Sequence, residues 1–563
     1  MIITDDELKA LVVKNNLIDE KEVERIKEYI QSTDTLLYDA LIERNVVSDE
    51  NLGILVADYL KLPFVVLSKI SIPEDVYRLI PERVARKQKI IPFAKDDFGL
   101  KIAMADPRNS AALKLIAQKT GLRIIPSFAT ERDISNTFYI YRQDLQKTFD
   151  RLLKEEIYGE VDTTTIREEA PIIKLVSLII EYAYQDKASD IHIEPQEEKC
   201  LVRFRIDGIL HDMLLLPKNL HDRIITRIKV ISNLRTDEHM SAQDGKIRFH
   251  VEDENMDIRV SILPIVDGEK AVLRLLSTHA RQFSLLDLGM GENDLLKLDK
   301  ALSKSYGMIL STGPTGSGKS TSIYAILRIL NRREKNITTI EDPVEYRIKG
   351  VNQINVNPKA GLTFASGLRS ILRQDPNIIF VGEIRDMETA GIAVNASLTG
   401  HMVLSTLHTN DAATTLPRLI DMKVEPFLVA TTANLIIAQR LIRRICEMCK
   451  VSFTVSKADF ETKLPQKIIS QHFGEHPEYR LYKGNGCKIC HNIGYAGRIG
   501  IFEILEVSKD LKELIVKRAD SETITRQAIQ EGMTTMLDDG LEKVKRGLTT
   551  VEEVMRVTKV ELV

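Results

Sequence analysis

The chain has 563 residues, of which 44% are hydrophobic and 28% are charged. A chain of this length is expected to form three or four domains, and this composition excludes an intrinsically disordered protein. The 78 basic residues are nearly balanced by 81 acidic ones. Since proteins that grip a polyanion usually carry a basic excess, nucleic acid is not expected as a substrate.

The N-terminal segment "MIITDDELKALVV" is acidic and lacks the basic and apolar regions of a secretory signal. The apolar run Ile172–Tyr184 is interrupted by Lys174 and Glu181, and no stretch reaches the roughly 18 uncharged apolar residues of a membrane helix. We therefore expect a cytoplasmic protein that associates peripherally with a membrane through partners. In that compartment the five cysteines are not expected to form disulfides.

An N-terminal domain is expected over residues 1–145, with a helical part (1–60) and an α/β part (61–145). Its helical part contains a weak repeat, because "VVKNNLIDEKEV" from position 12 resembles "LIERNVVSDENL" from position 41. Two similar amphipathic helix–turn–helix units and an ancestral duplication both explain this pattern. In the α/β part, "IIPFAKDDFGLKIAMADP" predicts a hairpin that turns at Asp97–Gly99.

Residues 146–169 are charged and rich in threonine, which predicts a helix followed by a linker. A small α/β domain is expected over residues 170–282, with strands at "ASDIHIEP", "CLVRFRIDGIL", "MDIRVSILP" and "EKAVLRLL". Residues 283–563 alternate strands with helices ("GMILSTG", "NITTIED", "NIIFVGE", "HMVLSTLH"), which predicts a doubly wound parallel sheet. The tail, residues 505–563, has helical spacing and should form a small helical cap.

The segment "GPTGSGKST" matches the phosphate-binding loop G-x-x-x-x-G-K-[ST] and lies between an expected strand and an expected helix. Loop amides and the helix N-terminus should hold the phosphates of a nucleotide, Lys319 adds a positive charge, and the hydroxyl of Ser320 can bind Mg²⁺. The residues expected to bind the nucleotide are Gly313, Pro314, Thr315, Gly316, Ser317, Gly318, Lys319, Ser320 and Thr321.

Acidic residues follow two of the expected strands. Parallel strands deliver ligand-facing residues at their carboxyl ends, so Glu383, at the end of "NIIFVGE", is expected to bind Mg²⁺ or its water. Glu341, Asp342 and Glu345 follow "NITTI", and one of them is the candidate base that orients the attacking water. The alternative is a solvated acidic loop.

Two histidines, His401 and His408, bracket the last of these strands. Seven residues of strand span about 23 Å, so one phosphate cannot touch both. The carboxyl-end rule selects His408 as the phosphate sensor. His401, at the other end, is expected to be structural or to lie at a subunit contact, and either could be a hydrogen-bonded core histidine.

Four of the five cysteines form two C-x-x-C pairs, which predicts a tetrahedral, structural zinc site over residues 446–490. Free reduced thiols are the alternative. The expected ligands are Cys446, Cys449, Cys487 and Cys490.

The runs "ASDIHIEP", "RFRIDG", "GPTGSGKST", "IEDPVEY", "LRQDPNIIFVGEIRD" and "GHMVLSTLHTNDA" resemble the secretion ATPase superfamily, over about residues 170–560. Members of this superfamily drive pilus extension, pilus retraction and type II secretion. The resemblance implies a hexameric ring in which each subunit joins a PAS-like small α/β domain to a P-loop, RecA-like domain that hydrolyses ATP with Mg²⁺.

The resemblance also assigns roles to individual residues. The family's catalytic glutamate matches Glu345, its second nucleotide-binding acid matches Glu383, and its histidine box contains both His401 and His408. Arginines that reach the phosphates from the small domain match Arg259 and Arg274, with Arg203 and Arg205 as weaker matches. The alternative for each is a strand-surface arginine.

The zinc clip and the N-terminal domain are both typical of the assembly ATPases in this superfamily. The repeat resembles a cyclic di-GMP-binding domain whose motif opens Arg-Leu-Gly and closes in Gln. In this chain the two copies of the motif begin with "ELK" (7–9) and "LLY" (36–38) in place of Arg-Leu-Gly. They end with Ile30 and Tyr59 in place of Gln. Without the arginine and glycine, cyclic di-GMP binding is not expected. A docking role toward an adaptor or platform protein is expected instead.

The expected function is that of an assembly motor for a type IV pilus, a homohexamer that acts on an inner-membrane platform protein. A type II secretion ATPase is the close alternative, and a DNA-translocating ring ATPase is a more distant one. A catalytically idle scaffold conflicts with the complete set of phosphate-site residues.

Overall fold

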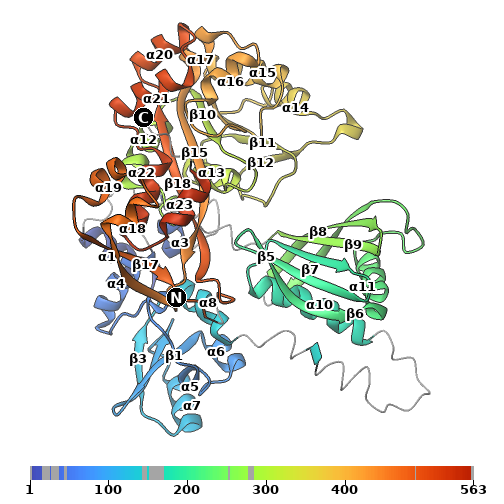
Figure 1. Cartoon of the computed structure of the whole chain (residues 1–563), viewed down its shortest axis with the longest axis vertical. Coiled ribbons are helices and arrows are strands. Elements are labelled where there is room, and N and C mark those ends of the chain that lie inside the picture. The colour runs from blue at the N-terminus through green and yellow to red at the C-terminus, as the bar shows by residue number, and fades with distance from the viewer. Residues whose placement is uncertain are drawn as a thin grey trace. The chain divides into compact units, whose positions relative to one another are not determined.

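The computed structural model describes residues 3–15, 37–43, 49–141, 170–251, 254–276, 284–487 and 490–558, together with Ile26, Val47, Phe149 and Asp150. These residues form two compact units, Asn136–Arg281 and a second unit made of Met1–Ser135 with Gln282–Val563 (Figure 1). Most of the expected linker and the first copy of the repeat lie outside the described residues.

The N-terminal segment contains helices and a small three-stranded sheet. In this sheet, β1 (Ile90–Asp96) pairs antiparallel with β2 (Gly99–Met104), which confirms the predicted hairpin, and β2 pairs parallel with β3 (Ile124–Phe128). The helices are α1 (Asp5–Lys14), α3 (Leu37–Glu43), α4 (Asp49–Leu60), α5 (Glu74–Tyr77), α6 (Glu82–Gln88), α7 (Ser110–Thr120) and α8 (Glu131–Thr137).

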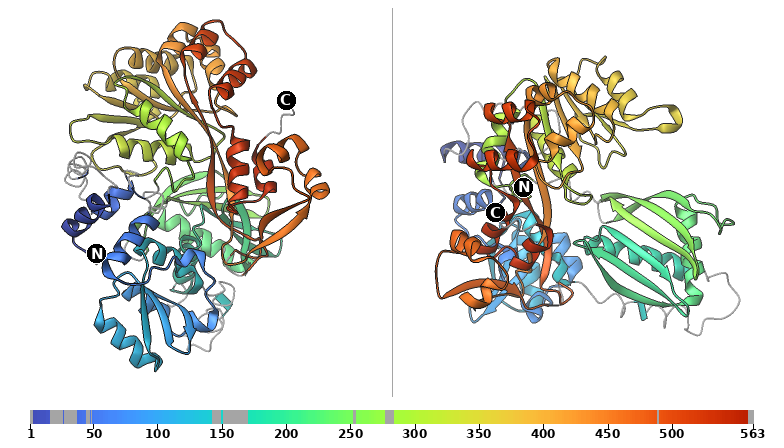
Figure 2. Two further views of the ribbon diagram at one scale, coloured as in Figure 1. Left: turned by 90° about the vertical axis from the view of Figure 1, so that its left-hand side faces the viewer. Right: turned by 45° about the horizontal axis from the view of Figure 1, so that its top comes forward.

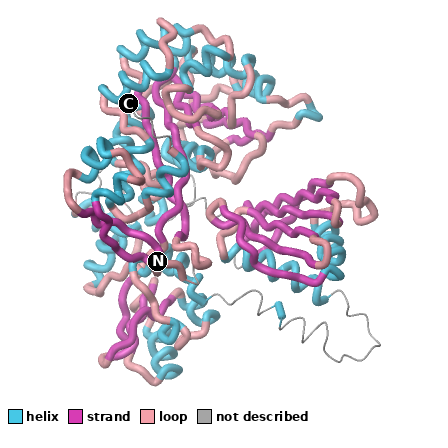
Figure 3. Tube along the Cα trace, viewed as in Figure 1, coloured by secondary structure: helices cyan, strands magenta, loops and turns pink. Residues whose placement is uncertain are grey.

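Unit Asn136–Arg281 is built on a six-stranded antiparallel sheet of order β6-β5-β4-β9-β8-β7 (Figure 3). The unit also has two helices, α10 and α11, whose buried residues form one hydrophobic core with buried residues of the sheet. The elements are α10 (Ala170–Gln185), β4 (Asp190–Pro195), β5 (Lys199–Ile206), β6 (Ile209–Pro217), α11 (Lys218–Ile231), β7 (Gln243–Val251), β8 (Glu254–Ile265) and β9 (Gly268–Leu276).

The C-terminal half is built on a seven-stranded sheet of order β12-β11-β13-β14-β10-β15-β18. Six of its strands are parallel, as predicted, and the edge strand β18 is antiparallel to β15. The strands are β10 (Gly307–Thr312), β11 (Ile337–Glu341), β12 (Asn352–Asn355), β13 (Ile378–Val381), β14 (Met402–Leu407), β15 (Ala433–Ile445) and β18 (Tyr495–Glu506).

Helices cover both faces of this sheet. On β10, Ile309 belongs to a core with α12 and α13, whereas Met308 and Leu310 belong to a core with α14–α17, because successive side chains of a strand point to opposite faces. These helices are α12 (Glu292–Leu302), α13 (Lys319–Leu330), α14 (Phe364–Ile371), α15 (Met387–Leu398), α16 (Thr415–Asp421) and α17 (Pro426–Thr432).

The long strands β15 and β18 extend past the rest of the sheet toward a hairpin of β16 (Lys450–Ser456) and β17 (Glu478–Gly484) (Figures 1 and 2). Six further helices form two groups along the chain: two lie between β16 and β17, and four follow β18. They are α18 (Lys457–Glu461), α19 (Gln466–Phe473), α20 (Lys509–Val516), α21 (Ser521–Gln530), α22 (Met536–Lys545) and α23 (Val551–Val557). None of the described helices has both the length and the apolar composition needed to cross a bilayer.

Candidate functional site

The phosphate-loop segment connects β10 to α13, in the order strand, loop, helix. Gly313 and Gly318 have φ values of 146° and 91°, in the region that favours glycine. A Cβ on Gly313 would lie 2.6 Å from the carbonyl oxygen of Gln439, and a Cβ on Gly318 would lie 2.9 Å from Gln439 Nε2. Close packing against β15 therefore requires glycine at both positions.

Lys319 begins α13 and folds back over the loop. Its Nζ donates to the carbonyl oxygens of Gly313 at 2.7 Å and of Pro314 at 3.1 Å. Burial lowers the pKa of Lys319 to about 8; Glu383 acts against this shift and Arg440 adds to it. A bound phosphate would place a negative charge beside this buried ammonium group and so stabilise its charged form.

Glu383 follows β13 and lies at the same edge of the sheet as the loop. Its Oε2 is 2.8 Å from Arg385 Nε and 3.3 Å from His408 Nε2. The structure thus brings His408 and Glu383 together, at the edge of the sheet where the parallel strands β10, β13 and β14 end. This carboxylate and the exposed hydroxyl of Ser320 are oxygen ligands of the kind that Mg²⁺ prefers.

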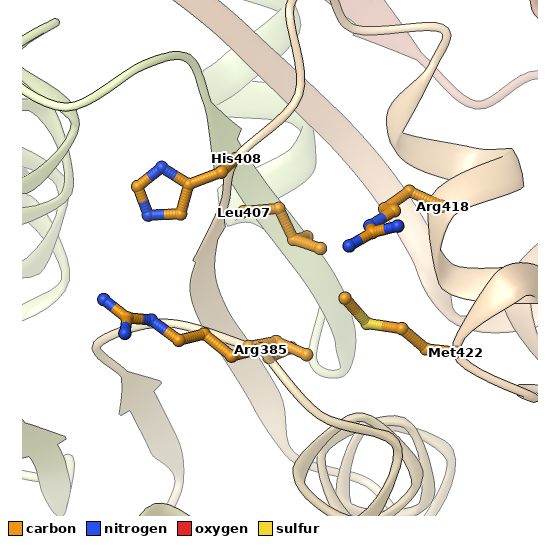
Figure 4. A pocket seen from close by; sticks show the side chains of 6 residues that line it. Arg385, Leu407, His408, Arg418 and Met422 are labelled. Atoms are coloured by element: carbon orange, nitrogen blue, oxygen red, sulfur yellow. The ribbon is translucent and has the colours of Figure 1, made fainter.

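A pocket of about 400 Å³ opens beside this group, on the face of the sheet that α16 covers. Figure 4 shows His408 and Arg385 on one side of it and Arg418 on the other. Its lining residues are Ile384, Arg385, Leu407, His408, Arg418 and Met422.

His401 lies at the opposite end of β14 from His408. Its carbonyl oxygen accepts from the amide of Gly307, the first residue of β10, and its Nδ1 lies 2.9 Å from the carbonyl oxygen of Ala396. The phosphate loop follows the last residue of β10, Thr312, so within one chain His401 is separated from the loop by the length of the strand.

Glu341 ends β11 and is 4% exposed. Its carboxylate accepts hydrogen bonds from Tyr324 Oη, from Thr339 Oγ1 at 2.5 Å and from Gln353 Nε2 at 3.3 Å. Burial raises the pKa of Glu341, and these hydrogen bonds act in the opposite direction. A carboxylate so enclosed is suited to holding its neighbours in position.

Glu345 is exposed and lies four residues further along the same acidic segment. Its backbone amide donates to Tyr324 Oη at 3.2 Å. The ring of Tyr324 packs edge-on against Tyr346, with ring centroids 4.5 Å apart. Tyr324 therefore connects the helix of the phosphate loop, the buried Glu341 and the backbone of Glu345.

Sequence reasoning missed Gln439 and Arg440, on β15. Gln439 Nε2 donates to the carbonyl oxygen of Ser317 at 2.7 Å, which fastens the loop to the sheet. Arg440 acts electrostatically on Lys319, and its Nη2 donates to Asn410 Oδ1 at 3.1 Å. The run "ANLIIAQRLIRRI" ends a buried strand in polar residues, which is the signal that could have identified them.

The other unit carries the two predicted arginines on adjacent strands, where Arg259 of β8 pairs in register with Arg274 of β9. The Arg274 side chain is 64% exposed, and its Nε lies 2.9 Å from Asp190 Oδ1. Arg205 Nε is 3.6 Å from the same carboxylate, whereas Arg203 pairs with Glu194 at 2.7 Å.

The four predicted zinc ligands form one cluster whose sulfur atoms all lie within 4.8 Å of one another. The Sγ atoms of Cys446 and Cys487, and of Cys449 and Cys490, are 3.8 Å apart, and those of Cys487 and Cys490 are 3.7 Å apart. A zinc tetrahedron with Zn–S bonds of about 2.3 Å has S···S edges of about 3.8 Å. The cluster therefore fits zinc, and the sulfurs are too far apart for disulfides.

A model of the type II/IV secretion system protein family matches residues 165–556, which include the phosphate loop, both acidic segments and the cysteines. The chain belongs to this family. A model of the MshEN domain matches residues 60–146.

Relatives in this family are ATPases of two kinds of machine. The chain is 37% identical to the type IV pilus assembly ATPase PilB of Myxococcus xanthus, over 97% of this chain and 98% of that protein. It is 42% identical to type II secretion system protein E of Pectobacterium carotovorum, over 86% and 97%. The Legionella pneumophila ATPase DotB shares the fold, with a TM-score of 0.51 at 20% identity over 71% of this chain and 97% of that one.

These findings confirm the fold class and the membership predicted from the motif series, and they identify the chain as an ATPase of secretion or pilus assembly. The MshEN domain binds cyclic di-GMP, so the expectation that this ligand is not bound is not confirmed.

Proposed function

We propose that the protein is the ATPase of type IV pilus assembly, a homohexamer located in the cytoplasm that works on an inner-membrane platform protein. The observation that carries this proposal is the match to PilB over nearly the whole of both chains, N-terminal segment included. The match to type II secretion protein E covers less of this chain, at slightly higher identity, and supports secretion as the second candidate.

In the proposed mechanism, the phosphate loop holds ATP, and Ser320 and Glu383 hold the Mg²⁺ that neutralises phosphate charge. Glu345, exposed in the segment that follows β11, orients the attacking water, and Glu341 supports it through Tyr324. His408, paired with Glu383, senses the γ-phosphate. His401 is structural or lies at a subunit contact.

The small domain contributes Arg259 and Arg274, which reach the phosphates when that domain closes on a nucleotide. Their positive charges stabilise the transferring phosphoryl group. Closure and opening then change the shape of the ring, and the platform protein converts this movement into the addition of pilin subunits. Zinc, held by the four cysteines, is structural.

A gene deletion with complementation tests this proposal. Loss of surface pili in the deletion strain, restored by the parent gene but not by Lys319→Ala, is the expected result. Lost protein export with pili intact would assign the chain to type II secretion instead. Co-purification of the chain with the platform protein of one machine distinguishes the two independently.

We also propose that the N-terminal segment binds a protein adaptor and not cyclic di-GMP. The MshEN match begins at residue 60, after the positions where the ligand motif departs from its pattern. At two of these positions the structure shows an internal contact, since Tyr59 Oη donates to Glu7 Oε1 at 3.0 Å. Submicromolar binding of cyclic di-GMP in titration calorimetry would overturn this proposal.

A further inference from the structure

The loop after β14, residues 408–415, carries His408 and is fastened to the strand that leads into the phosphate loop. The amide of Thr409 donates to Thr312 Oγ1 at 2.9 Å, and the two hydroxyl oxygens are 2.5 Å apart. Thr409 Oγ1 is also 2.8 Å from Thr415 Oγ1. These hydrogen-bonded hydroxyl groups fix the position of the first residues of the loop relative to β10.

The middle of the same loop is held by a carboxylate from the edge of the sheet. Glu503 of β18 is 6% exposed, and its Oε1 accepts from the amide of Ala412 at 2.8 Å. Beside it, the amide of Phe502 on the same strand donates to Asp539 Oδ2 of α22 at 2.8 Å, and the backbone of Met536, the first residue of α22, lies near enough to favour the charged form of Glu503. One buried side chain thus joins the loop that carries His408 to the first turn of a C-terminal helix.

The surroundings of Glu503 disfavour its charge. Burial raises its pKa to about 7, Asp411 of the loop and Asp538 of α22 act in the same direction, and the two backbone amides oppose the shift. His472 Nε2 of α19 lies 2.9 Å from Asp538 Oδ1. A group with this pKa changes its protonation state in the neutral range.

We propose that Glu503 is a positioning residue for ATP hydrolysis, which fixes the loop of His408 and couples it to helix α22. The inference rests on hydrolysis of ATP, the activity of the family, and on the sensor role proposed for His408. The ionised carboxylate accepts a charge-assisted hydrogen bond from the amide of Ala412, and protonation weakens that bond. A change at the nucleotide site can then reach the C-terminal helices through residues 408–412.

The test uses the full-length chain and the variant Glu503→Gln. The glutamine side chain has the same shape but no charge, so the amide of Ala412 loses its charge-assisted hydrogen bond. The variant also removes a buried charge, so its folding stability above pH 7 should equal or exceed that of the parent. Glu506→Gln is the matched control, because Glu506 lies on the same strand, half-exposed, and pairs with Lys300 at the surface.

ATP hydrolysis is measured from pH 6 to pH 9 for the three proteins. We expect Glu503→Gln to lower kcat by about tenfold above pH 7 with KM for ATP unchanged, as for the loss of one charge-assisted hydrogen bond outside the nucleotide contacts. We also expect the ionisation near pH 7 in the parent profile to be absent from the variant. Hydrogen exchange of the peptide that contains Ala412 should quicken in the variant and stay unchanged in Glu506→Gln.

A parental kcat, a parental pH profile and parental exchange in Glu503→Gln would overturn the inference. So would an equal loss in Glu506→Gln. The proposed nucleotide site is tested separately in the same assay. Lys319→Ala and His408→Ala should both lose hydrolysis, and parental rates in both would contradict that site.

Discussion

At the scale of single residues, Glu341 and Glu345 show how two acids of one short segment acquire different roles. Glu341 is enclosed by three donors, whereas Glu345 is exposed and its backbone amide donates to Tyr324 Oη. An exposed carboxylate can meet a water molecule and a nucleotide, and a buried one can hold its neighbours in place. The sequence alone left open which acid is the base.

Glu345→Gln should therefore abolish hydrolysis while leaving the fold intact. Loss of a general base typically costs about 10²–10⁴-fold in rate, and an exposed substitution changes the free energy of unfolding by about 0.5 kcal/mol or less. ATP hydrolysis and urea unfolding check the two parts. Hydrolysis by Glu345→Gln at the parental rate would show that the base lies elsewhere.

Glu341→Ala provides the contrast. It leaves the hydroxyls of Tyr324 and Thr339 buried without their acceptor, so the free energy of unfolding should fall by about 2 kcal/mol or more. The pKa of Glu341 is raised in the fold, so its carboxyl contributes most to stability below its ordinary pKa and less as the pH rises. Urea unfolding at pH 5 and pH 8 should therefore show a smaller loss at pH 8, and an equal or larger loss there would contradict this account.

At the scale of elements, the strands β10, β11, β13 and β14 were predictable, whereas the place of β15 in the sheet was not. Strands β10, β11, β13 and β14 are short apolar runs bounded by turn residues, and this pattern is visible in a single sequence. The hydrophobic run of β15 is also visible in the sequence, but its position beside the phosphate loop is not. Gln439 approaches the phosphate loop because β15 pairs with β10, and strand pairing between distant segments has no local signal.

The cysteines were predictable because metal ligands must recur at fixed short spacings. What the spacing could not show is which elements they join. Cys446 follows β15, Cys449 precedes β16, Cys487 lies just after β17 and Cys490 precedes β18. A metal at this point connects the ends of the two long strands to the hairpin, so its stabilising effect should extend along β15 toward Gln439.

Zinc removal tests this role. We expect one zinc per chain by atomic absorption, retained in Cys200→Ala and lost in the double variant Cys446→Ser, Cys449→Ser. Loss of a structural metal from four strand ends should lower the midpoint of thermal unfolding by on the order of 5 °C or more. Unchanged metal content or an unchanged midpoint in the double variant would refute a structural zinc site.

At the scale of the whole molecule, the groups proposed to act on one phosphate belong to separate compact units. The phosphate loop, Glu383 and His408 lie in one unit, and the strands that carry Arg259 and Arg274 lie in the other. Hydrolysis that uses all of them requires the units, of one chain or of neighbouring chains, to meet around the nucleotide. This dependence links the chemical step to a movement, which a motor needs.

Arg274→Ala tests that dependence. The side chain is largely exposed beside Asp190, so its removal should not impair folding. The rate should fall by about 10²–10³-fold, as when one donor that stabilises the charge of the transition state is removed. Arg248→Ala is the matched control, because Arg248 is an exposed strand arginine of the same sheet, paired with Asp257. Single-turnover hydrolysis and binding of a fluorescent ATP analogue separate the chemical step from affinity. If Arg274→Ala and Arg248→Ala both hydrolyse ATP at the parental rate, this arginine does not reach the nucleotide, and the movement must be coupled to hydrolysis through other residues.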